Sequence, residues 1–231
     1  RSLAGDGCRE MSEGATAASF VAKWRARWPE WNVAEAFVDP GQRPVAEAWF
    51  ALLQEIREAA WSGEDPTPGL AQLAWWHEEL EGWAKGVRRH PLGQILQRQP
   101  APWSVLARAL NSLPATRPEP AQQATRGVHG FAGAVAQCEV ALFGRGRDGD
   151  AAAGDAHGVL ELAERVLLTG ERSDIAWLLE RWPGLGGAVR ARRVHSALLR
   201  RRLQTLPDGG QPVPLPGWRV LLAAWRAARG R

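Results

Sequence analysis

The side chains best suited to bind a ligand fall on one predicted helix, which runs from about Pro68 to Gly86. Gln72, Trp75 and Glu79 follow one another at three- and four-residue steps, so they share one face of that helix. Ligand pockets combine aromatic walls with a few polar groups, and this row has that composition. The row has two interpretations. It lines a ligand cavity, or Trp75 packs on a neighbouring helix and Glu79 reaches solvent.

Polar side chains on other predicted helices leave the same choice open. Glu55 lies at the edge of the apolar face of the preceding helix, where it either points into a cavity or covers the rim of the core. Glu58 lies farther from that face and is most simply a surface carboxylate. His129 lies on a glycine-rich helix, and its side chain either faces the cavity or has no role in ligand binding. Gln54, Glu55 and His129 therefore join the row above as candidate pocket-lining residues.

Several classes of catalytic site have no counterpart in the sequence. The five histidines form no pair at the spacing that a helical metal site needs. Neither a GxSxG nucleophile elbow nor a GxxxxGK[ST] phosphate loop occurs. Cys8 and Cys138 form no CxxC pair, which favours two reduced thiols in a cytoplasmic protein over a zinc or disulfide site.

The composition is that of a globular chain. It has 231 residues, of which 45% are hydrophobic and 23% charged. This length supports a core that needs no disulfide or metal. The apolar runs are too short for a spanning helix. Residues 1–11 lack the apolar segment of a signal peptide and are expected to be a disordered leader or added sequence. Abundant Arg, Ala and Gly with only two Lys suggest a GC-rich bacterial genome.

Apolar residues recur at helical spacing throughout, and no stretch alternates as a strand does. The sequence therefore predicts a single all-α domain over residues 12–231 with about nine helices. A proline-rich linker is expected at 113–120 and a flexible glycine-rich loop at 144–154. Helices are predicted at 15–28, 44–61, 68–86, 91–98, 102–112, 121–143, 156–169, 173–181, 187–205 and 217–229.

Two of these helices carry predictions about packing. Helix 68–86 has an apolar stripe and a second large face, which indicates a central helix buried on both sides. In helix 121–143, Gly127, Gly130 and Gly133 recur every third residue, which favours close approach of another helix or a ligand there. The predicted stripe of helix 68–86 consists of Leu70, Leu73, Trp76, Leu80, Trp83 and Val87.

Arginines concentrate near the carboxyl end of the chain. They could meet nucleic-acid phosphates, an anionic membrane surface, or carboxylates such as Glu161, Glu164 and Glu180. Arginines within 189–203 surround their helix instead of sharing a face, which disfavours nucleic acid. Peripheral membrane contact is the more favoured external partner. The arginines are Arg190, Arg192, Arg193, Arg200, Arg201, Arg202, Arg219, Arg226, Arg229 and Arg231.

Three segments in order resemble a known family. The first is Phe50-Ala-Leu-Leu-Gln-Glu-Ile-Arg-Glu-Ala-Ala. The second is Pro68-Gly-Leu-Ala-Gln-Leu-Ala-Trp-Trp-His-Glu-Glu-Leu80, with its Leu-x-Trp-Trp-x-x-x-Leu motif, and the third is His90-Pro91-Leu92. Together they are similar to the squalene/phytoene synthase family, most sharply over residues 48–96.

The resemblance implies a helical bundle of the isoprenoid synthase type with a central cavity. Active members condense two prenyl diphosphates, and two aspartate-rich segments hold the Mg²⁺ that neutralises the diphosphates. The matching segments here lack those aspartates. The first is Gln54-Glu55-Ile56-Arg57-Glu58, in which Arg57 intrudes, and in the second, around Glu161 to Glu171, the Arg-Asp-x-x-x-Asp arrangement is missing.

Degenerate segments of this kind resemble a divergent subgroup that includes relatives of a mitochondrial complex I assembly factor. We therefore expect a catalytically degenerate protein without a cofactor, cytoplasmic or membrane-associated, that binds an isoprenoid or lipid, with Glu161 lining the cavity, or acts as an assembly factor. One alternative is a Mg²⁺-dependent prenyltransferase that uses Glu55, Glu58, Glu161 and Glu164 in place of the aspartates. Another is a helical interaction module without a cavity.

Overall fold

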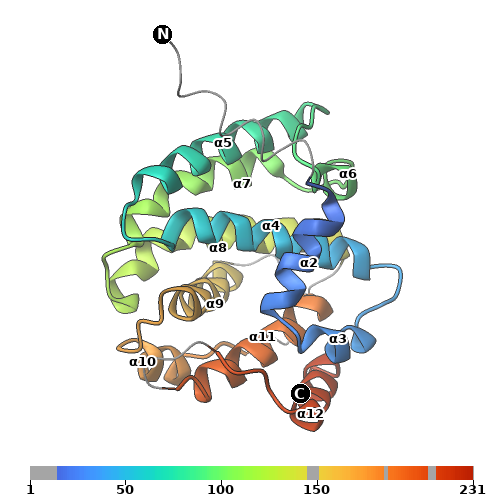
Figure 1. Ribbon diagram of the computed structural model, residues 1–231, viewed down its shortest axis with the longest axis vertical. Coiled ribbons are helices and arrows are strands. Elements are labelled where there is room, and N and C mark those ends of the chain that lie inside the picture. Colours follow the sequence, from blue (N-terminus) through green and yellow to red (C-terminus); the bar gives the residue numbers. More distant parts are fainter. Residues whose placement is uncertain (1–14, 145–150, 185–186, 208–211, 231) are drawn as a thin grey trace.

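The described part of the chain is a bundle of helices (Figure 1). The computed structural model describes residues 15–144, 151–184, 187–207 and 212–230. These segments contain eleven α-helices and no strand, which confirms the all-α prediction. The helices are α2 (Ala17–Arg27), α3 (Trp31–Ala34), α4 (Arg43–Trp61), α5 (Thr67–Ala84), α6 (Gly93–Leu96), α7 (Trp103–Ala109), α8 (Ala121–Phe143), α9 (Ala151–Thr169), α10 (Ile175–Glu180), α11 (Arg190–Gln204) and α12 (Gly217–Ala228), with 3₁₀ helices η1 (Glu35–Phe37), η2 (Leu110–Ser112) and η3 (Pro114–Thr116).

Local sequence signals set several of the helix ends. Thr16 caps α2, because its side chain accepts a hydrogen bond from the backbone N–H of Ser19 while the Ser19 hydroxyl accepts one from the backbone of Thr16. Pro120 precedes α8, and Gly144 ends it with a φ of +64°, a conformation that favours glycine. Helix α8 thus has the predicted bounds.

Other bounds differ from the prediction. Helix α9 begins at Ala151, so the end of the glycine-rich loop predicted at 144–154 is helical. Gly154 lies in that helix at a close approach, since a Cβ there would be 3.2 Å from Cε1 of His129. The rest of the loop, residues 145–150, lies outside the described residues, as do the predicted leader 1–11 and Cys8.

Helix α4 occupies the centre of the bundle. Helices α2, α5, α6 and α9 pack against it, and it crosses the middle of the molecule in Figure 1. Trp49, Leu52 and Ile56 on this helix are fully buried. The sequence predicted α5 in this role, and that prediction is wrong. Only one face of α5 is covered, and Leu70 is 46% exposed, as is Val87 beyond its end, at 61%. Trp76 is buried, as predicted.

The glycine row of α8 has a different explanation from the predicted one. A Cβ at Gly127 would lie 2.7 Å from Cγ2 of Thr116, so close packing requires glycine there. A Cβ at Gly130 or Gly133 would meet nothing within 4 Å. The expected close approach therefore holds at the first of the three glycines and not at the other two.

Aromatic side chains fill the space between α2, α3, α4 and α11. The ring of Phe50 stacks on Trp24 at 5.5 Å and on His195 at 4.5 Å, and its edge meets Trp31. All four are almost completely buried. Aromatic side chains of this size bury about 150–250 Å² each, so they dominate the burial that holds these helices together.

The last three helices close one end of the molecule (Figure 1). Helix α11 packs against α9, α10 and α12. Arg193 fixes the end of α12, since its Nε donates to the carbonyl of Ala227 at 2.9 Å and its Nη2 to that of Ala228 at 3.1 Å. Among the helices of the described segments, none combines the length and the apolar character needed to cross a bilayer.

Candidate functional site

Seven ionisable side chains meet in the interior of the bundle, and we call them the central ion cluster. Four helices supply them: α4, α8, α9 and α11. Each side chain is at most 4% exposed as a residue. Buried ionisable groups are costly unless they are paired, so their arrangement decides what this site can do. The members are Arg57, Glu139, His157, Glu161, Glu164, Arg192 and His195.

Arg57 binds Glu161 through two parallel hydrogen bonds. Its Nε donates to Oε2 and its Nη2 to Oε1, both at 2.7 Å. Its Nη1 lies 3.5 Å from Oε1 of Glu164. Burial alone lowers the pKa of Arg57, but the carboxylates of Glu161 and Glu164 raise that pKa above its ordinary value. The guanidinium therefore stays charged and occupies both oxygens of Glu161.

Glu139 is the acceptor of the second half of the cluster. Trp49 Nε1 donates to its Oε1 at 2.9 Å, and Arg192 donates to the same oxygen from Nε at 2.8 Å and from Nη2. His157 Nε2 lies 3.1 Å from its Oε2. Burial raises the pKa of Glu139, but Arg192 and His157 outweigh it, so the pKa lies well below its usual range. This carboxylate is ionised and fully engaged.

Glu164 and His195 form the part of the cluster with unmet hydrogen bonds. Oε1 of Glu164 lies 3.6 Å from Nε2 of His195. In the described part of the chain, this oxygen, both ring nitrogens of His195 and Nη1 of Arg192 have no hydrogen-bond partner. Burial raises the pKa of Glu164, with Arg57 opposing it. Burial, followed by Arg192 and Arg57, lowers the pKa of His195.

The charged groups of the interior are paired. The raised pKa shifts Glu164 toward the neutral acid, and the lowered pKa shifts His195 toward the neutral ring. Arg57 pairs with Glu161 and Arg192 pairs with Glu139, and such pairing makes buried charges tolerable. Arginine therefore neutralises two of the three glutamates of the central ion cluster.

The predicted carboxylates of α4 lie in a separate place from this cluster. Lys23 of α2 donates to Oε1 of Glu55 at 2.7 Å and to Oε2 of Glu58 at 2.6 Å, and Gln54 donates to Oε1 of Glu58 at 2.9 Å. Burial raises the pKa of Glu55, although Lys23 opposes it. Glu55 and Glu58 bind Lys23, whereas Glu161 binds Arg57, so the structure does not bring the four glutamates together around one ion.

The predicted row on α5 separates in the structure. Gln72 is exposed, while Trp75 is half-buried and packs against Trp76 and His90. Glu79 is buried, not solvent-facing as one interpretation had it. It accepts hydrogen bonds at 2.7 Å from Nε1 of Trp83 and from the backbone N–H of Arg89 and of His90.

Glu79 thus anchors the segment that follows α5. Burial raises the pKa of this carboxyl, but the hydrogen bonds from the backbone of His90 and Arg89 and from the side chains of Trp83 and Arg89 outweigh it, so the pKa lies below its usual range. His129 of α8 is exposed, and its Nδ1 lies 3.1 Å from Oδ1 of Asp155. Of the predicted lining residues, only Glu161 reaches the central ion cluster.

The other members of the central ion cluster leave only weak signals in the sequence. For Arg192 and the other arginines near the carboxyl end, the sequence leaves three partners open: nucleic acid, an anionic membrane surface, or carboxylates within the fold. The last alternative holds for Arg192, which binds Glu139, and for Arg202, which binds Glu30. The signal was the absence of a polar face: arginines that surround a helix must include some that point inward.

Metal binding finds no support in the donor set. Among the described residues, no group of three or more His, Cys, Asp or Glu side chains is arranged to hold a metal ion. Mg²⁺ is usually held by one or two carboxylates together with water and phosphate oxygens. Here Arg57 occupies both oxygens of Glu161, and Arg192 and His157 occupy those of Glu139. Comparison of the chain with family models, curated proteins and solved structures gave no match.

Proposed function

We propose that this protein is a squalene/phytoene-synthase-like bundle that has lost prenyl transfer and acts as an interaction or assembly factor. One observation carries the proposal. Where the resemblance puts two facing carboxylate segments with Mg²⁺ between them, Arg57 of α4 forms two hydrogen bonds to Glu161 of α9. A side-chain cation supplies the positive charge that the metal supplies in an active member.

The arginines also oppose binding of the substrate ion pair. A Mg²⁺ ion placed near Glu161 would lie beside the Arg57 guanidinium and would be repelled by it in a medium of low dielectric constant. Displacing Arg57 would leave that guanidinium buried without its partner, which costs about 3–5 kcal/mol. The residues present therefore do not fit the metal, and no catalytic step is derived through it.

Packing favours a protein partner over an internal ligand. The space between α2, α3, α4 and α11 is filled by the rings of Trp24, Trp31, Phe50 and His195. The space between α4, α8, α9 and α11 is filled by the central ion cluster. An interaction surface, not an internal isoprenoid site, is the function that such an interior supports.

The test is incubation of the purified chain with MgCl₂ and farnesyl or geranylgeranyl diphosphate. The proposal predicts no pyrophosphate release above a control without protein. Release that is efficient and that Glu161→Gln abolishes would overturn it. Loss of turnover in Glu55→Gln would instead support the glutamate-based prenyltransferase. Extraction and mass spectrometry of the same preparation test the lipid-carrier version, which a stoichiometric isoprenoid would favour.

A further inference from the structure

Helix α12 packs its small side chains inward and holds its large apolar ones outward. Val220 and Ala224 are its buried residues. Trp218 is 66% exposed, Leu221 54% and Trp225 40%, and Leu222 beside them is also exposed. At helical spacing these four fall on one face, opposite the buried one. The apolar face of α12 is therefore these four side chains, and the bundle does not cover it.

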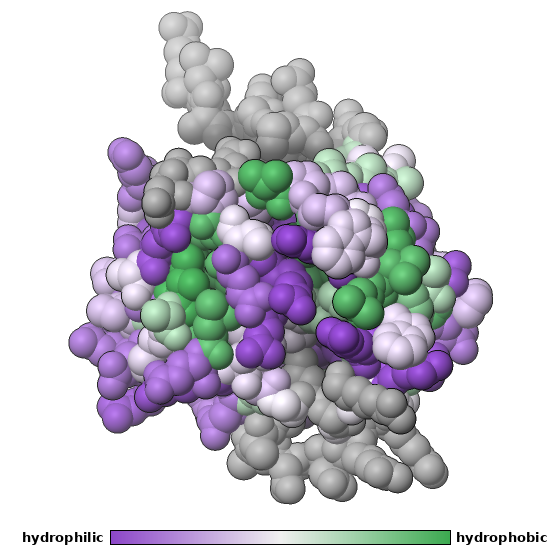
Figure 2. Space-filling model, turned by 90° about the horizontal axis from the view of Figure 1, so that it is seen from below, coloured by the Kyte–Doolittle hydropathy of each residue, from purple (hydrophilic) through white to green (hydrophobic). Residues whose placement is uncertain are grey.

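The two tryptophans of this face stand out among the 13 in the chain. The other tryptophans are buried or half-buried within the bundle, and most belong to the main core. Contiguous exposed apolar patches mark sites that meet a protein or a membrane, whereas scattered single residues do not. Figure 2 shows this end of the molecule, where apolar patches alternate with strongly hydrophilic side chains.

Arginines border the apolar face. The guanidinium of Arg219 lies 5.2 Å from the ring centre of Trp218, and that of Arg229 lies 4.2 Å from the ring centre of Trp225. Arg226 follows Trp225 directly, and all three arginines are exposed. The sequence of α12 contains no Asp or Glu. The helix thus presents tryptophan, leucine and arginine together, without compensating negative charge.

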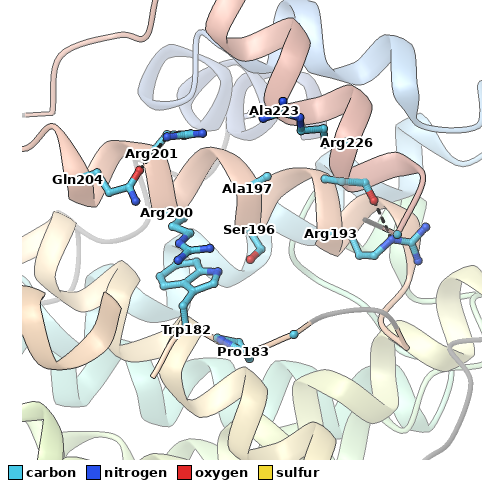
Figure 3. Close-up of a pocket in the computed structure, with 13 residues that line it drawn as sticks. Trp182, Pro183, Arg193, Ser196, Ala197, Arg200, Arg201, Gln204, Ala223 and Arg226 are labelled. Atoms are coloured by element: carbon cyan, nitrogen blue, oxygen red, sulfur yellow. Dashed lines mark hydrogen bonds between the residues drawn. The ribbon is translucent and has the colours of Figure 1, made fainter. Parts of the chain in front are cut away.

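The positive surface continues into a groove of about 540 Å³ between α11 and α12 (Figure 3). Arg226 lines it from α12, and Arg200 and Arg201 line it from α11. Arg200 lies over the ring of Trp182 at 6.0 Å. No Asp or Glu is among the described residues that line the groove. An anionic surface that meets α12 would therefore meet these arginines too.

We propose that α12 lies flat on an anionic membrane surface. Tryptophan and leucine would enter the boundary between headgroups and acyl chains, and the arginines would contact the anionic headgroups. Charge decides against a second copy of this chain, because two apolar faces brought together would also bring together two sets of unpaired arginines. This binding would be peripheral, and the proposal does not depend on whether the protein has enzymatic activity.

Vesicle sedimentation of the full chain tests the proposal. The protein should bind vesicles of phosphatidylcholine with phosphatidylglycerol much more strongly than vesicles of phosphatidylcholine alone, and added salt should weaken the binding. Replacing Arg219, Arg226 and Arg229 together by Gln should lower the partition coefficient about a hundredfold, at roughly fivefold per arginine. The same replacement at the exposed Arg98, Arg108 and Arg126 is the matched control and should have little effect.

The apolar contribution is tested by Trp218→Ser/Trp225→Ser, which alters exposed side chains only and should leave the circular dichroism spectrum unchanged. This variant should lose binding and lose the quenching of its fluorescence by brominated lipid. Leu70→Ser/Val87→Ser, equally exposed but remote, should retain both. Absence of binding to anionic vesicles, or binding that neither α12 variant weakens, would overturn the proposal. So would a dimer in solution that the tryptophan variant dissociates.

Discussion

Arg57 and Glu161 are both cut off from water, so each depends on the other for its charge. Their exposed side-chain fractions are 4% and 0%, and their two hydrogen bonds leave neither oxygen of Glu161 without a donor. A buried pair of this kind adds little net stability compared with well-packed apolar residues, but breaking it is expensive. Replacing one partner should therefore lower stability far more than replacing both partners with apolar residues.

We predict that Arg57→Met lowers the free energy of unfolding by about 3–5 kcal/mol, because it leaves Glu161 buried without its cation. The double variant Arg57→Met/Glu161→Met should recover much of the loss. Urea unfolding measures both. Arg181→Met is the control, since Arg181 and Glu180 form an exposed pair whose loss should cost at most about 1 kcal/mol. Additive losses in the double variant would show that the two groups are not coupled.

A second residue-scale prediction concerns pH. Burial lowers the pKa of His90 from 6.5 to about 4, although Glu79 opposes it. The unfolded chain therefore binds a proton that the folded chain excludes, and stability falls as the pH drops from 6.5 to about 4. The limiting slope for one such group is about 1.4 kcal/mol per pH unit.

His90→Asn isolates this contribution. In the wild type, Nδ1 of His90 accepts a hydrogen bond from the backbone N–H of Leu92 at 3.2 Å. Asparagine keeps an acceptor at this position but removes the titrating ring. The variant is less stable at neutral pH because it loses packing against Trp76. Its free energy of unfolding should nevertheless change less steeply across the window than that of the wild type. An unchanged slope in urea titrations at several pH values would contradict the assignment.

At the scale of helices, α4 and α5 exchange the roles that the sequence suggested. The periodicity of α5 identified Leu73, Trp76, Leu80 and Trp83 correctly as buried, but the two ends of the predicted stripe, Leu70 and Val87, are exposed. Periodicity could not show how many neighbours the helix has. Helix α4 is covered by α2, α5, α6 and α9, whereas the outer face of α5 is left to solvent. Helical spacing predicts which residues share a face, and only the assembled fold decides which faces are covered.

Glycines give the element-scale prediction. A methyl group at Gly69, in the first turn of α5, would collide with the carbonyl oxygen of Ala59 in α4, so Gly69→Ala should cost about 1–3 kcal/mol. Gly130→Ala in α8 is the matched variant. Its new methyl group would meet nothing, and it should stabilise the protein by about 0.4–1 kcal/mol.

Thermal unfolding of the two glycine variants compares them directly. Opposite shifts in Tm are expected, downward for Gly69→Ala and upward for Gly130→Ala. An unchanged or raised Tm for Gly69→Ala would mean that the contact between α4 and α5 does not constrain Gly69, and a lowered Tm for Gly130→Ala would contradict the prediction for that site.

The same limit explains what could be predicted about the site. The sequence alone shows that the segments around Glu55 and Glu161 lack aspartate and that Arg57 lies within the first of them. Its partner could not be predicted, because Glu161 is 104 residues away in sequence. Nothing in local spacing distinguishes Arg192, which is buried, from its exposed neighbour Arg190. Short α3 was missed because four residues carry no measurable period.

At the scale of the molecule, arginine has two distinct uses. Inside, Arg57, Arg192 and Arg202 neutralise carboxylates contributed by distant segments. Outside, the arginines of α12 and of the groove beside it have no acidic neighbours among the residues that line the groove. The interior arginines are therefore paired with carboxylates, whereas those of α12, and Arg200 and Arg201 of the groove, are exposed on the surface.

The proposed loss of prenyl transfer requires that Arg57 binds Glu161 where, by the resemblance, an active enzyme would hold Mg²⁺. Titration with Mn²⁺, a paramagnetic substitute for Mg²⁺, tests this most directly, because electron paramagnetic resonance counts the free ion. We predict that adding the wild-type chain leaves the free Mn²⁺ signal equal to that of a matched protein-free sample, both without and with the same concentration of a prenyl diphosphate. Saturable loss of that signal at one ion per chain, abolished by Glu161→Gln, would contradict the account.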